Sequence, residues 1–142
     1  MTKMPKIWQA GADDMRPLRD ALRHADFRGT LETDSALREA MSTDNSVYRI
    51  LPDLVAAPLD AADMACFVAV MDQPAFRAIP LTARGGGTGT NGQALNAGVI
   101  VDTRRHMHRL LHLDLQEGWA DVEPGMVLDD LNAQIRHSGW VL

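Results

Sequence analysis

Several features that mark other classes of protein are scarce or missing in this sequence. Cys66 is the single cysteine, so no internal disulfide can form, and its apolar helical surroundings favour a buried, unreactive thiol. No apolar run is long enough to cross a membrane, and the N-terminus lacks the apolar core of a signal peptide. The net charge of −5 argues against nucleic acid or an anionic membrane surface as a partner. We therefore expect a cytoplasmic protein without an integral membrane segment.

The first third of the chain predicts helices and no site. Apolar residues recur at helical spacing between residues 13 and 25. A second short helix is expected over residues 34–41, where the carboxylate of Asp34 can accept hydrogen bonds from the first free backbone N–H groups. Residues 1–41 are therefore expected to form a helical leader to the rest of the chain.

The remaining residues, 42–142, alternate between strand and helix patterns. The predicted strands cover residues 54–56, 78–82, 99–101, 110–115 and 119–122, and the predicted helices cover residues 61–72 and 127–137. A strand, a helix and a strand within thirty residues predict a βαβ unit with parallel strands. The last two strands are joined by a hairpin turn at 116–118. The expected fold class is α+β, of an α/β-like kind, with a small parallel sheet, hairpin strands and packed helices.

Five of the eleven glycines fall between positions 85 and 92, directly after a predicted strand. A loop with almost no Cβ atoms can turn its backbone N–H groups inward and let an anion approach the main chain. Arg84 adds a positive charge at the entrance, and Thr88, Thr90 and Asn91 add short polar donors. We therefore predict a diphosphate-binding loop whose N–H groups share one concavity bounded by Arg84.

Two familiar phosphate motifs do not fit this loop. A P-loop needs Lys and then Ser or Thr after its last glycine, but Gln93 follows Gly92. The dinucleotide pattern GxGxxG fits residues 87–92 by letter, yet it requires a helix to begin at the last glycine. The six residues 93–98 before the next strand are too few for that helix. A loop that joins two strands directly remains, as does a flexible surface loop without a ligand.

Two polar clusters favour ordinary structural roles. His106, His108 and His112 lack a nearby cysteine or carboxylate that would complete a metal site, so a solvated histidine cluster is favoured. Asp129 and Asp130 begin a predicted helix, where carboxylates stabilise the positive end of the helix dipole.

The segment Arg84–Gly89 resembles the diphosphate loop of the FAD-linked oxidases of the vanillyl-alcohol-oxidase fold, whose FAD-binding domain is of the PCMH type. Flanking segments are similar to further landmarks of that family, at residues 44–48, 52–58, 99–102 and 122–125. Within the family, the run Thr82–Asn96 is most similar to bacterial D-2-hydroxyacid dehydrogenases. The D-2-hydroxyglutarate type, which is fused to an iron–sulfur domain, is the most similar of these, and the D-lactate and glycolate dehydrogenases are related to it.

The resemblance implies a set of FAD-binding residues. They are Arg84, Gly85, Gly86, Gly87, Thr88, Gly89, Thr90 and Asn91 in the loop, and Ser46 and Tyr48 in the entry segment. Tyr48 could equally be a half-buried anchor with no ligand contact. Some members bind the flavin covalently through a histidine in this loop, and Thr88 stands at that position here. The resemblance therefore implies non-covalent FAD.

The resemblance also implies that the parent protein is an enzyme. It would oxidise a small D-2-hydroxy acid to a 2-oxo acid by hydride transfer to FAD, and an iron–sulfur cluster would lie outside this chain. Residues 42–142 would be the truncated first part of the FAD-binding domain, without catalytic residues. We expect the fragment alone to fold, to bind FAD weakly, to be inactive and to form a homodimer. The alternatives are a non-redox module for another phosphate ligand and a non-catalytic interaction remnant.

Overall fold

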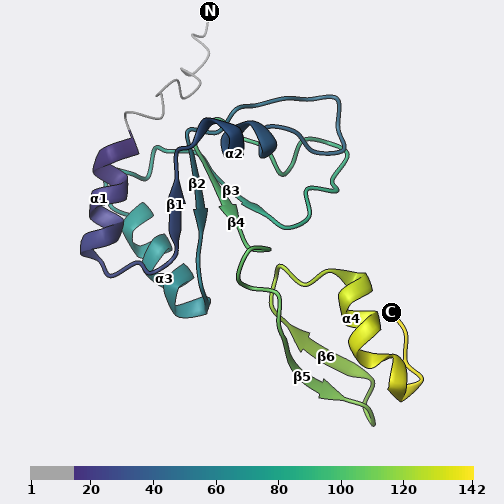
Figure 1. Ribbon diagram of the computed structural model, residues 1–142. Helices are drawn as coiled ribbons and strands as arrows, with labels where there is room; N and C mark the ends of the chain where they lie inside the picture. Colours follow the sequence, from purple (N-terminus) through teal and green to yellow (C-terminus); the bar gives the residue numbers. More distant parts are fainter. Residues whose placement is uncertain (1–14) are drawn as a thin grey trace, which may run out of the picture.

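The computed structural model describes residues 15–142 of the chain (Figure 1). Ten helices and strands follow one another in this part. They are α1 (Arg16–His24), β1 (Thr30–Glu32), α2 (Ser35–Ala40), β2 (Leu54–Ala57), α3 (Ala61–Met71), β3 (Leu81–Arg84), β4 (Val99–Asp102), β5 (Leu110–Asp114), β6 (Trp119–Val122) and α4 (Leu128–Ile135). The expected start of the first helix at Asp13 lies outside the described residues. No helix of the described part is both long and apolar enough to cross a membrane.

A four-stranded sheet with the order β1-β2-β4-β3 organises the first hundred residues. The strands β2 and β3 are each parallel to β4, as the βαβ pattern predicted, but β4 lies between them. The strand β1 pairs antiparallel with β2 and was not predicted. It has only three residues, and its extended conformation depends on hydrogen bonds to the edge of β2. Because β2 lies more than twenty residues further along the chain, a local pattern does not reveal this strand.

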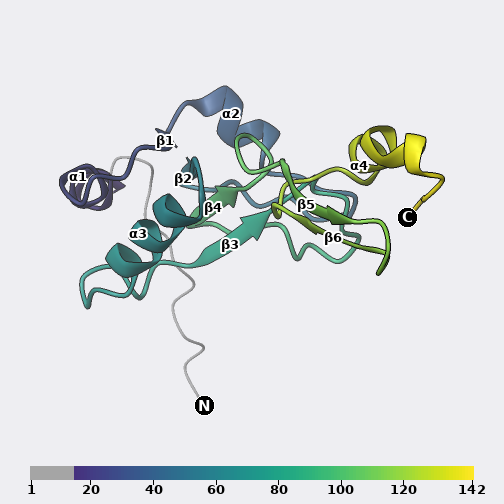
Figure 2. The same ribbon diagram turned by 90° about the horizontal axis from the view of Figure 1, so that it is seen from below.

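The helices α1 and α3 cover one face of this sheet (Figure 2). Leu54 and Ala56 of β2 and Val99 and Val101 of β4 pack against them in one apolar core. The alternate residue Ile100 is also fully buried, on the opposite face. Burial on both faces explains why β2 and β4 are continuous apolar runs, which is typical of parallel strands. Because α1 contributes to this core, the residues assigned to the leader pack together with the rest of the chain.

The hairpin of β5 and β6 lies beyond the carboxyl ends of β3 and β4, together with α4 (Figures 1 and 2). Its antiparallel pairing confirms the predicted hairpin. The helix α4 buries Leu131 and Ile135, and a short 3-10 turn at Arg136–Ser138 follows it. Gly139 then adopts a left-handed conformation with φ of 81°, as expected of a glycine that ends a helix. The predicted α+β class, with a small parallel sheet, a hairpin and packed helices, is confirmed.

Two predictions from the sequence need correction. The strand β3 begins at Leu81 and not at residue 78, because residues 73–79 form successive turns and Pro80 has no N–H to donate to a ladder. The strand therefore ends at Arg84 and leads directly into the glycine loop. Cys66 is half-buried and not buried, since α3 places its Sγ at the rim of the core, where it donates a hydrogen bond of 3.0 Å to the carbonyl of Ala25.

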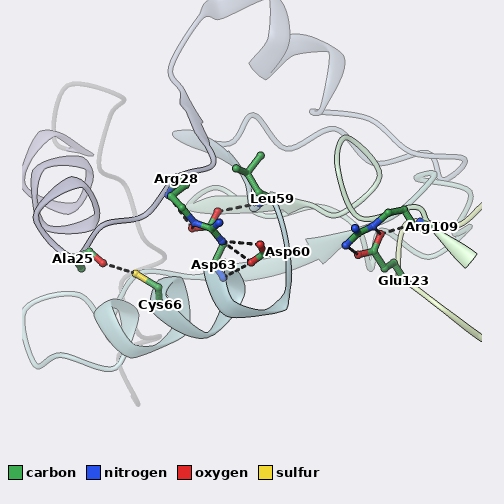
Figure 3. A network of polar contacts seen from close by, with 8 residues as sticks. All are labelled: Ala25, Arg28, Leu59, Asp60, Asp63, Cys66, Arg109 and Glu123. Carbon is green, nitrogen blue, oxygen red and sulfur yellow. Dashed lines mark hydrogen bonds and ion pairs between the residues drawn. The ribbon is translucent and has the colours of Figure 1, made fainter. Parts of the chain in front are cut away.

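A buried carboxylate connects the start of α3 to the segment before β1 (Figure 3). One oxygen of Asp63 accepts from the backbone N–H of Arg28 at 2.8 Å, and the other accepts from the N–H of Leu59 at 2.9 Å. The Asp63 side chain is 1% exposed. Gly29 is packed so closely here that a Cβ would meet Phe27 at 2.7 Å and Asp63 at 2.9 Å. A substitution at Asp63 or at Gly29 would therefore disturb the junction of β1, β2 and α3.

We predict that Asp63→Asn lowers the free energy of unfolding by about 1–3 kcal/mol, because an amide NH₂ would face a backbone N–H whichever way it turns. Asp72→Asn is the matched control, since the Asp72 side chain is 82% exposed and its pair with Arg77 lies on the surface. It should change stability by less than about 0.5 kcal/mol. Urea unfolding of both variants measures the difference, and equal effects would show that the buried carboxylate is not needed.

Candidate functional site

The glycine loop leaves the carboxyl end of β3 and returns to the amino end of β4. The two strands are parallel neighbours, so the loop has to travel back along the whole sheet edge. Gly87 and Gly92 adopt left-handed conformations, with φ of 66° and 76°. These are conformations that residues with a Cβ rarely adopt. Gly85 and Gly86 are exposed at the start of the loop.

The Arg84 side chain extends from the start of the loop toward the end of α2. Its Nη2 donates to the carbonyl of Thr43 at 2.9 Å, and its Nη1 donates to the carbonyl of Met41 at 3.4 Å. The guanidinium also occupies the space that a Cβ on Gly87 would need. The residues that accept these bonds precede Arg84 by more than forty positions, so the sequence pattern carried no signal for them.

The entry segment of residues 43–48 lies along the far part of the loop. Asn45 Nδ2 donates to the carbonyl of Thr88 at 3.5 Å. The ring of Tyr48 and the hydroxyl of Ser46 both lie near the Cβ position of Gly92, at 3.0 and 3.8 Å. The structure therefore brings Ser46 and Tyr48 together with the loop, and Tyr48 remains 57% exposed.

Asp44 fixes the turn in this entry segment. Its Oδ1 accepts from the N–H of Ser46 at 2.8 Å, and Ser46 Oγ in turn accepts from the N–H of Tyr48 at 3.1 Å. The hydrogen bond with the Ser46 side chain lowers the pKa of Asp44 most, and the N–H groups of Ser46 and Ala94 and the charge of Arg84 act in the same direction. A carboxylate that stays ionised keeps this turn closed against the loop.

Gln93 supports the loop from its other end. Its Oε1 accepts from the N–H of Asn91 at 3.0 Å, and its side chain fills the space beside Gly89. The N–H of Leu95 then bonds the carbonyl of Gly92 at 3.1 Å and closes the turn toward β4. Sequence reasoning missed Gln93 and Asn45, because single amides in a polar loop carry no distinguishing pattern.

A hollow of about 400 Å³ opens at the carboxyl ends of β3 and β4. Eight residues line it: Ala40, Met41, Arg84, Gly85, Gly86, Asp102, Arg104 and Arg105. The lining holds three arginines and one aspartate, so the hollow is cationic and suited to an anion. Arg105 pairs with Glu32 at 3.7 Å, while Asp102 accepts from the backbone N–H of Arg104 at 3.0 Å.

The first glycines of the loop thus line a cationic hollow, while Thr88, Thr90 and Asn91 are exposed further along. A single concavity for all N–H groups from Gly85 to Thr90 stays a prediction. Neither Arg104 nor Arg105 was predicted as a site residue, although both follow a strand end, where ligands of parallel sheets often bind.

The opposite wall of the loop comes from the turn after β6. The carbonyl of Pro124 lies 3.9 Å from the Cβ position of Gly85. Glu123 is 6% exposed and holds this turn, because it accepts from Arg109 Nη2 at 2.7 Å, from Nε at 3.1 Å and from the N–H at 2.8 Å (Figure 3). The hydrogen bond with the Arg109 side chain is the main cause that lowers the pKa of Glu123.

The histidines considered as a metal site lie in different surroundings. The ring of His112 packs against Trp119 with centroids 4.9 Å apart, and His108 Nδ1 lies 3.0 Å from the carbonyl of Arg104. Within residues 15–142 no three His, Cys, Asp or Glu side chains are grouped as metal ligands.

Comparisons with known proteins agree on one family. Residues 52–142 match the family model described as FAD binding domain. A D-2-hydroxyglutarate dehydrogenase from Pseudomonas putida is 46% identical over 120 residues, which are 84% of this chain and 12% of that protein. The Escherichia coli K12 enzyme of the same name is 45% identical over 119 residues, again 84% of this chain and 12% of that protein. The chain therefore spans about an eighth of the length of these curated relatives.

Solved structures show the same fold at low sequence identity. An alkyldihydroxyacetonephosphate synthase superposes with a TM-score of 0.73 at 19% identity, over 94% of this chain and 28% of that one. The 6-hydroxy-D-nicotine oxidase of Arthrobacter nicotinovorans superposes with a TM-score of 0.67 at 24% identity, over 81% of this chain and 25% of that one.

We predict that Glu123→Gln destabilises the hairpin unit by about 1–3 kcal/mol near neutral pH. Because the folded pKa of Glu123 is lowered, its contribution is complete above the unfolded pKa of about 4.3 and is lost as the pH falls through the folded value. The difference between wild type and variant should therefore close in acid. Urea unfolding followed by tryptophan fluorescence in a Trp8→Phe background reports on this part of the chain, since Trp119 lies in the hairpin and Trp140 lies beside it.

Glu117→Gln is the control for this measurement, because Glu117 is exposed in the hairpin turn. It should change stability little at either pH. A Glu123→Gln penalty that persists unchanged in acid would contradict the role of the ionised pair.

Proposed function

Because the chain belongs to the FAD binding domain family, as the resemblance of its glycine loop predicted, we propose that this loop binds the diphosphate of FAD. When bound, FAD supplies a flavin ring that accepts a hydride. The chain supplies backbone N–H donors in a cationic hollow beside that diphosphate. The proposed contacts are Gly85, Gly86, Gly87, Thr88, Gly89, Thr90 and Asn91 of the loop, with Ser46 and Tyr48 beside its far end.

The observation that carries this proposal is a difference among the five glycines. At Gly87, Gly89 and Gly92 a Cβ would meet the side chains of Arg84, Gln93 and Tyr48, so the fold itself requires glycine or needs those side chains to move.

At Gly85 and Gly86 a Cβ would meet nothing closer than 3.9 and 3.5 Å. The fold therefore does not require glycine at these two positions, which both line the hollow. The absence of a side chain there leaves the main chain open to a ligand, which is how diphosphates are bound.

The attachment is proposed to be non-covalent. Thr88 stands where covalent members of the resembling family carry histidine, and no histidine lies between Phe76 and Arg105. The observation supports FAD that is held by hydrogen bonds and charge and is released by dialysis.

We predict that FAD titrated into the ¹⁵N-labelled chain shifts the amide signals of Gly85–Asn91, and that riboflavin, which lacks the diphosphate, does not. The titration also detects weak binding, and dialysis should restore the original spectrum.

Gly86→Ala should keep the free energy of unfolding within about 1 kcal/mol of wild type but weaken FAD binding about tenfold or more, equivalent to 1.4 kcal/mol. Equal shifts with riboflavin, or FAD shifts far from the loop, would contradict the proposal. Tighter binding of ADP than of FAD would favour a module for another phosphate ligand.

We further propose that the longer protein oxidises a D-2-hydroxy acid to the 2-oxo acid. The identity to two D-2-hydroxyglutarate dehydrogenases supports this class of substrate. The groups that would abstract the substrate proton are not among the residues assigned here, so the chain contributes the FAD site and not the chemistry. An iron–sulfur cluster in the longer protein and a homodimer stay predictions.

Anaerobic addition of D-2-hydroxyglutarate to the full-length flavoprotein should bleach the flavin absorbance, whereas the L-enantiomer should leave it unchanged. If neither enantiomer bleaches the flavin but another 2-hydroxy acid does, that acid would be the substrate in place of D-2-hydroxyglutarate. Bleaching by no 2-hydroxy acid would overturn the proposed activity.

A further inference from the structure

The side chain of Arg84 lines the cationic hollow and extends from the start of the glycine loop toward residues 41–43. The backbone of Arg84 is fixed in the sheet, since its carbonyl accepts from the N–H of Thr103 at 3.0 Å and from the Thr103 hydroxyl at 3.1 Å. The half-buried side chain then extends to residues 41–43, where both of its terminal nitrogens donate to carbonyl oxygens. Two of the five guanidinium N–H donors are therefore engaged before any ligand arrives.

The carbonyls that receive it carry partial negative charge and are themselves held in place. Met41 is the C-cap residue of α2, and the last carbonyls of a helix attract a cation. Ser42, between Met41 and Thr43, is 1% exposed. Its hydroxyl donates to the backbone carbonyl of Glu39 at 2.7 Å, and its own carbonyl accepts from the backbone N–H of Ile50 at 2.9 Å. Arg84 thus ties the loop to a fixed point.

The loop closes over this side chain at one residue. Gly87 has a left-handed backbone, and a Cβ there would overlap the guanidinium. The guanidinium consequently fills the space under the loop, and its position decides how closely the chain from Gly85 to Thr88 can approach the entry segment. Asn45 completes the contact from the other side through the carbonyl of Thr88.

We propose that Arg84 is a positioning residue, which holds the glycine loop in its binding shape against the carbonyls of Met41 and Thr43 and does not contact the diphosphate itself. This differs from the direct contact that the sequence resemblance implied, and it refines the proposed function by separating the residue that shapes the loop from the charges that face the ligand.

The energetic reason is the entropy of the loop. Ordering a residue costs about 1–2 kcal/mol of backbone entropy, and glycine costs the most. A loop that is already ordered in the ligand-free chain does not lose this free energy on binding, so its affinity is higher. The benefit exists only if Arg84 keeps the loop rigid without a ligand.

The test is ¹⁵N relaxation of the ligand-free chain, so that its outcome does not depend on FAD binding. Wild type should show order parameters near 0.85 for Gly85–Thr90, and Arg84→Ala should lower them below about 0.6. Arg84→Lys keeps one donor and should fall between. Arg104→Ala is the matched control, because it removes one positive charge from the same hollow and should leave the loop ordered. Amides of α3 should be unchanged in all variants.

Gly87→Ala gives a second, independent variant. Its methyl would overlap the guanidinium, and its backbone would be strained at a φ of 66°. It should therefore loosen the loop more in the wild-type background than in the Arg84→Ala background, where only the backbone strain remains. A wild-type loop that is already flexible, an Arg84→Ala loop as ordered as wild type, or equal loosening by Arg104→Ala would each overturn the proposal.

FAD titration at several salt concentrations adds a second measurement, because a general loss of stability does not change how the affinity depends on salt. Arg84→Ala should weaken binding more than Arg104→Ala does, while the two variants reduce the salt dependence of the affinity equally, because each removes one charge from the same hollow. A larger loss of salt dependence with Arg84→Ala would assign Arg84 a direct phosphate contact and overturn the positioning role. If FAD does not bind at all, the proposed function fails while the relaxation result still decides the role of Arg84.

Discussion

The hydrogen bonds from Arg84 to the carbonyls of Met41 and Thr43 are the constraint on which the site depends. They join the end of β3 to the end of α2, two points that lie more than forty residues apart in the sequence. A loop with five glycines in eight residues has little tendency to hold any one shape. Arg84 and Gln93 restrict that freedom, because their side chains fill the space beside Gly87 and Gly89. The cationic hollow at Gly85 and Gly86 is the space that remains open.

Local chemistry explains which parts of the fold were predictable from the sequence. Asp34 and Asp60 each accept from N–H groups of the helix that follows, as short carboxylates at such positions do. The hairpin of β5 and β6 was predictable in the same way, because its turn at residues 116–118 lies between its two strands. The order of the sheet does not, because β4 inserts between β2 and β3 through contacts that no short pattern encodes. The strand β1 was missed for the same reason, since its ladder partner is β2 and its own three residues carry no strand pattern.

The candidate site also has one part that the sequence predicts and another part that only the structure shows. Glycine density and the strand before it predict a diphosphate-binding loop at residues 85–91, and this assignment stays a prediction. They were not enough to show that Gly87 and Gly89 serve contacts with Arg84 and Gln93, while Gly85 and Gly86 leave the main chain accessible. That distinction requires knowing what surrounds each Cα. Arg104 and Arg105 were missed because they come together with the loop only through the parallel pairing of β3 and β4.

The most direct measurement is a crystal structure of the chain with FAD bound. We expect diphosphate oxygens at hydrogen-bond distance, about 2.7–3.2 Å, from the backbone N–H groups of Gly85 and Gly86. The guanidinium of Arg84 should still donate to the carbonyls of Met41 and Thr43. A diphosphate bound elsewhere on the chain would contradict the assignment of the loop. A guanidinium turned away from those carbonyls and onto the phosphate would contradict the account of how the loop is held.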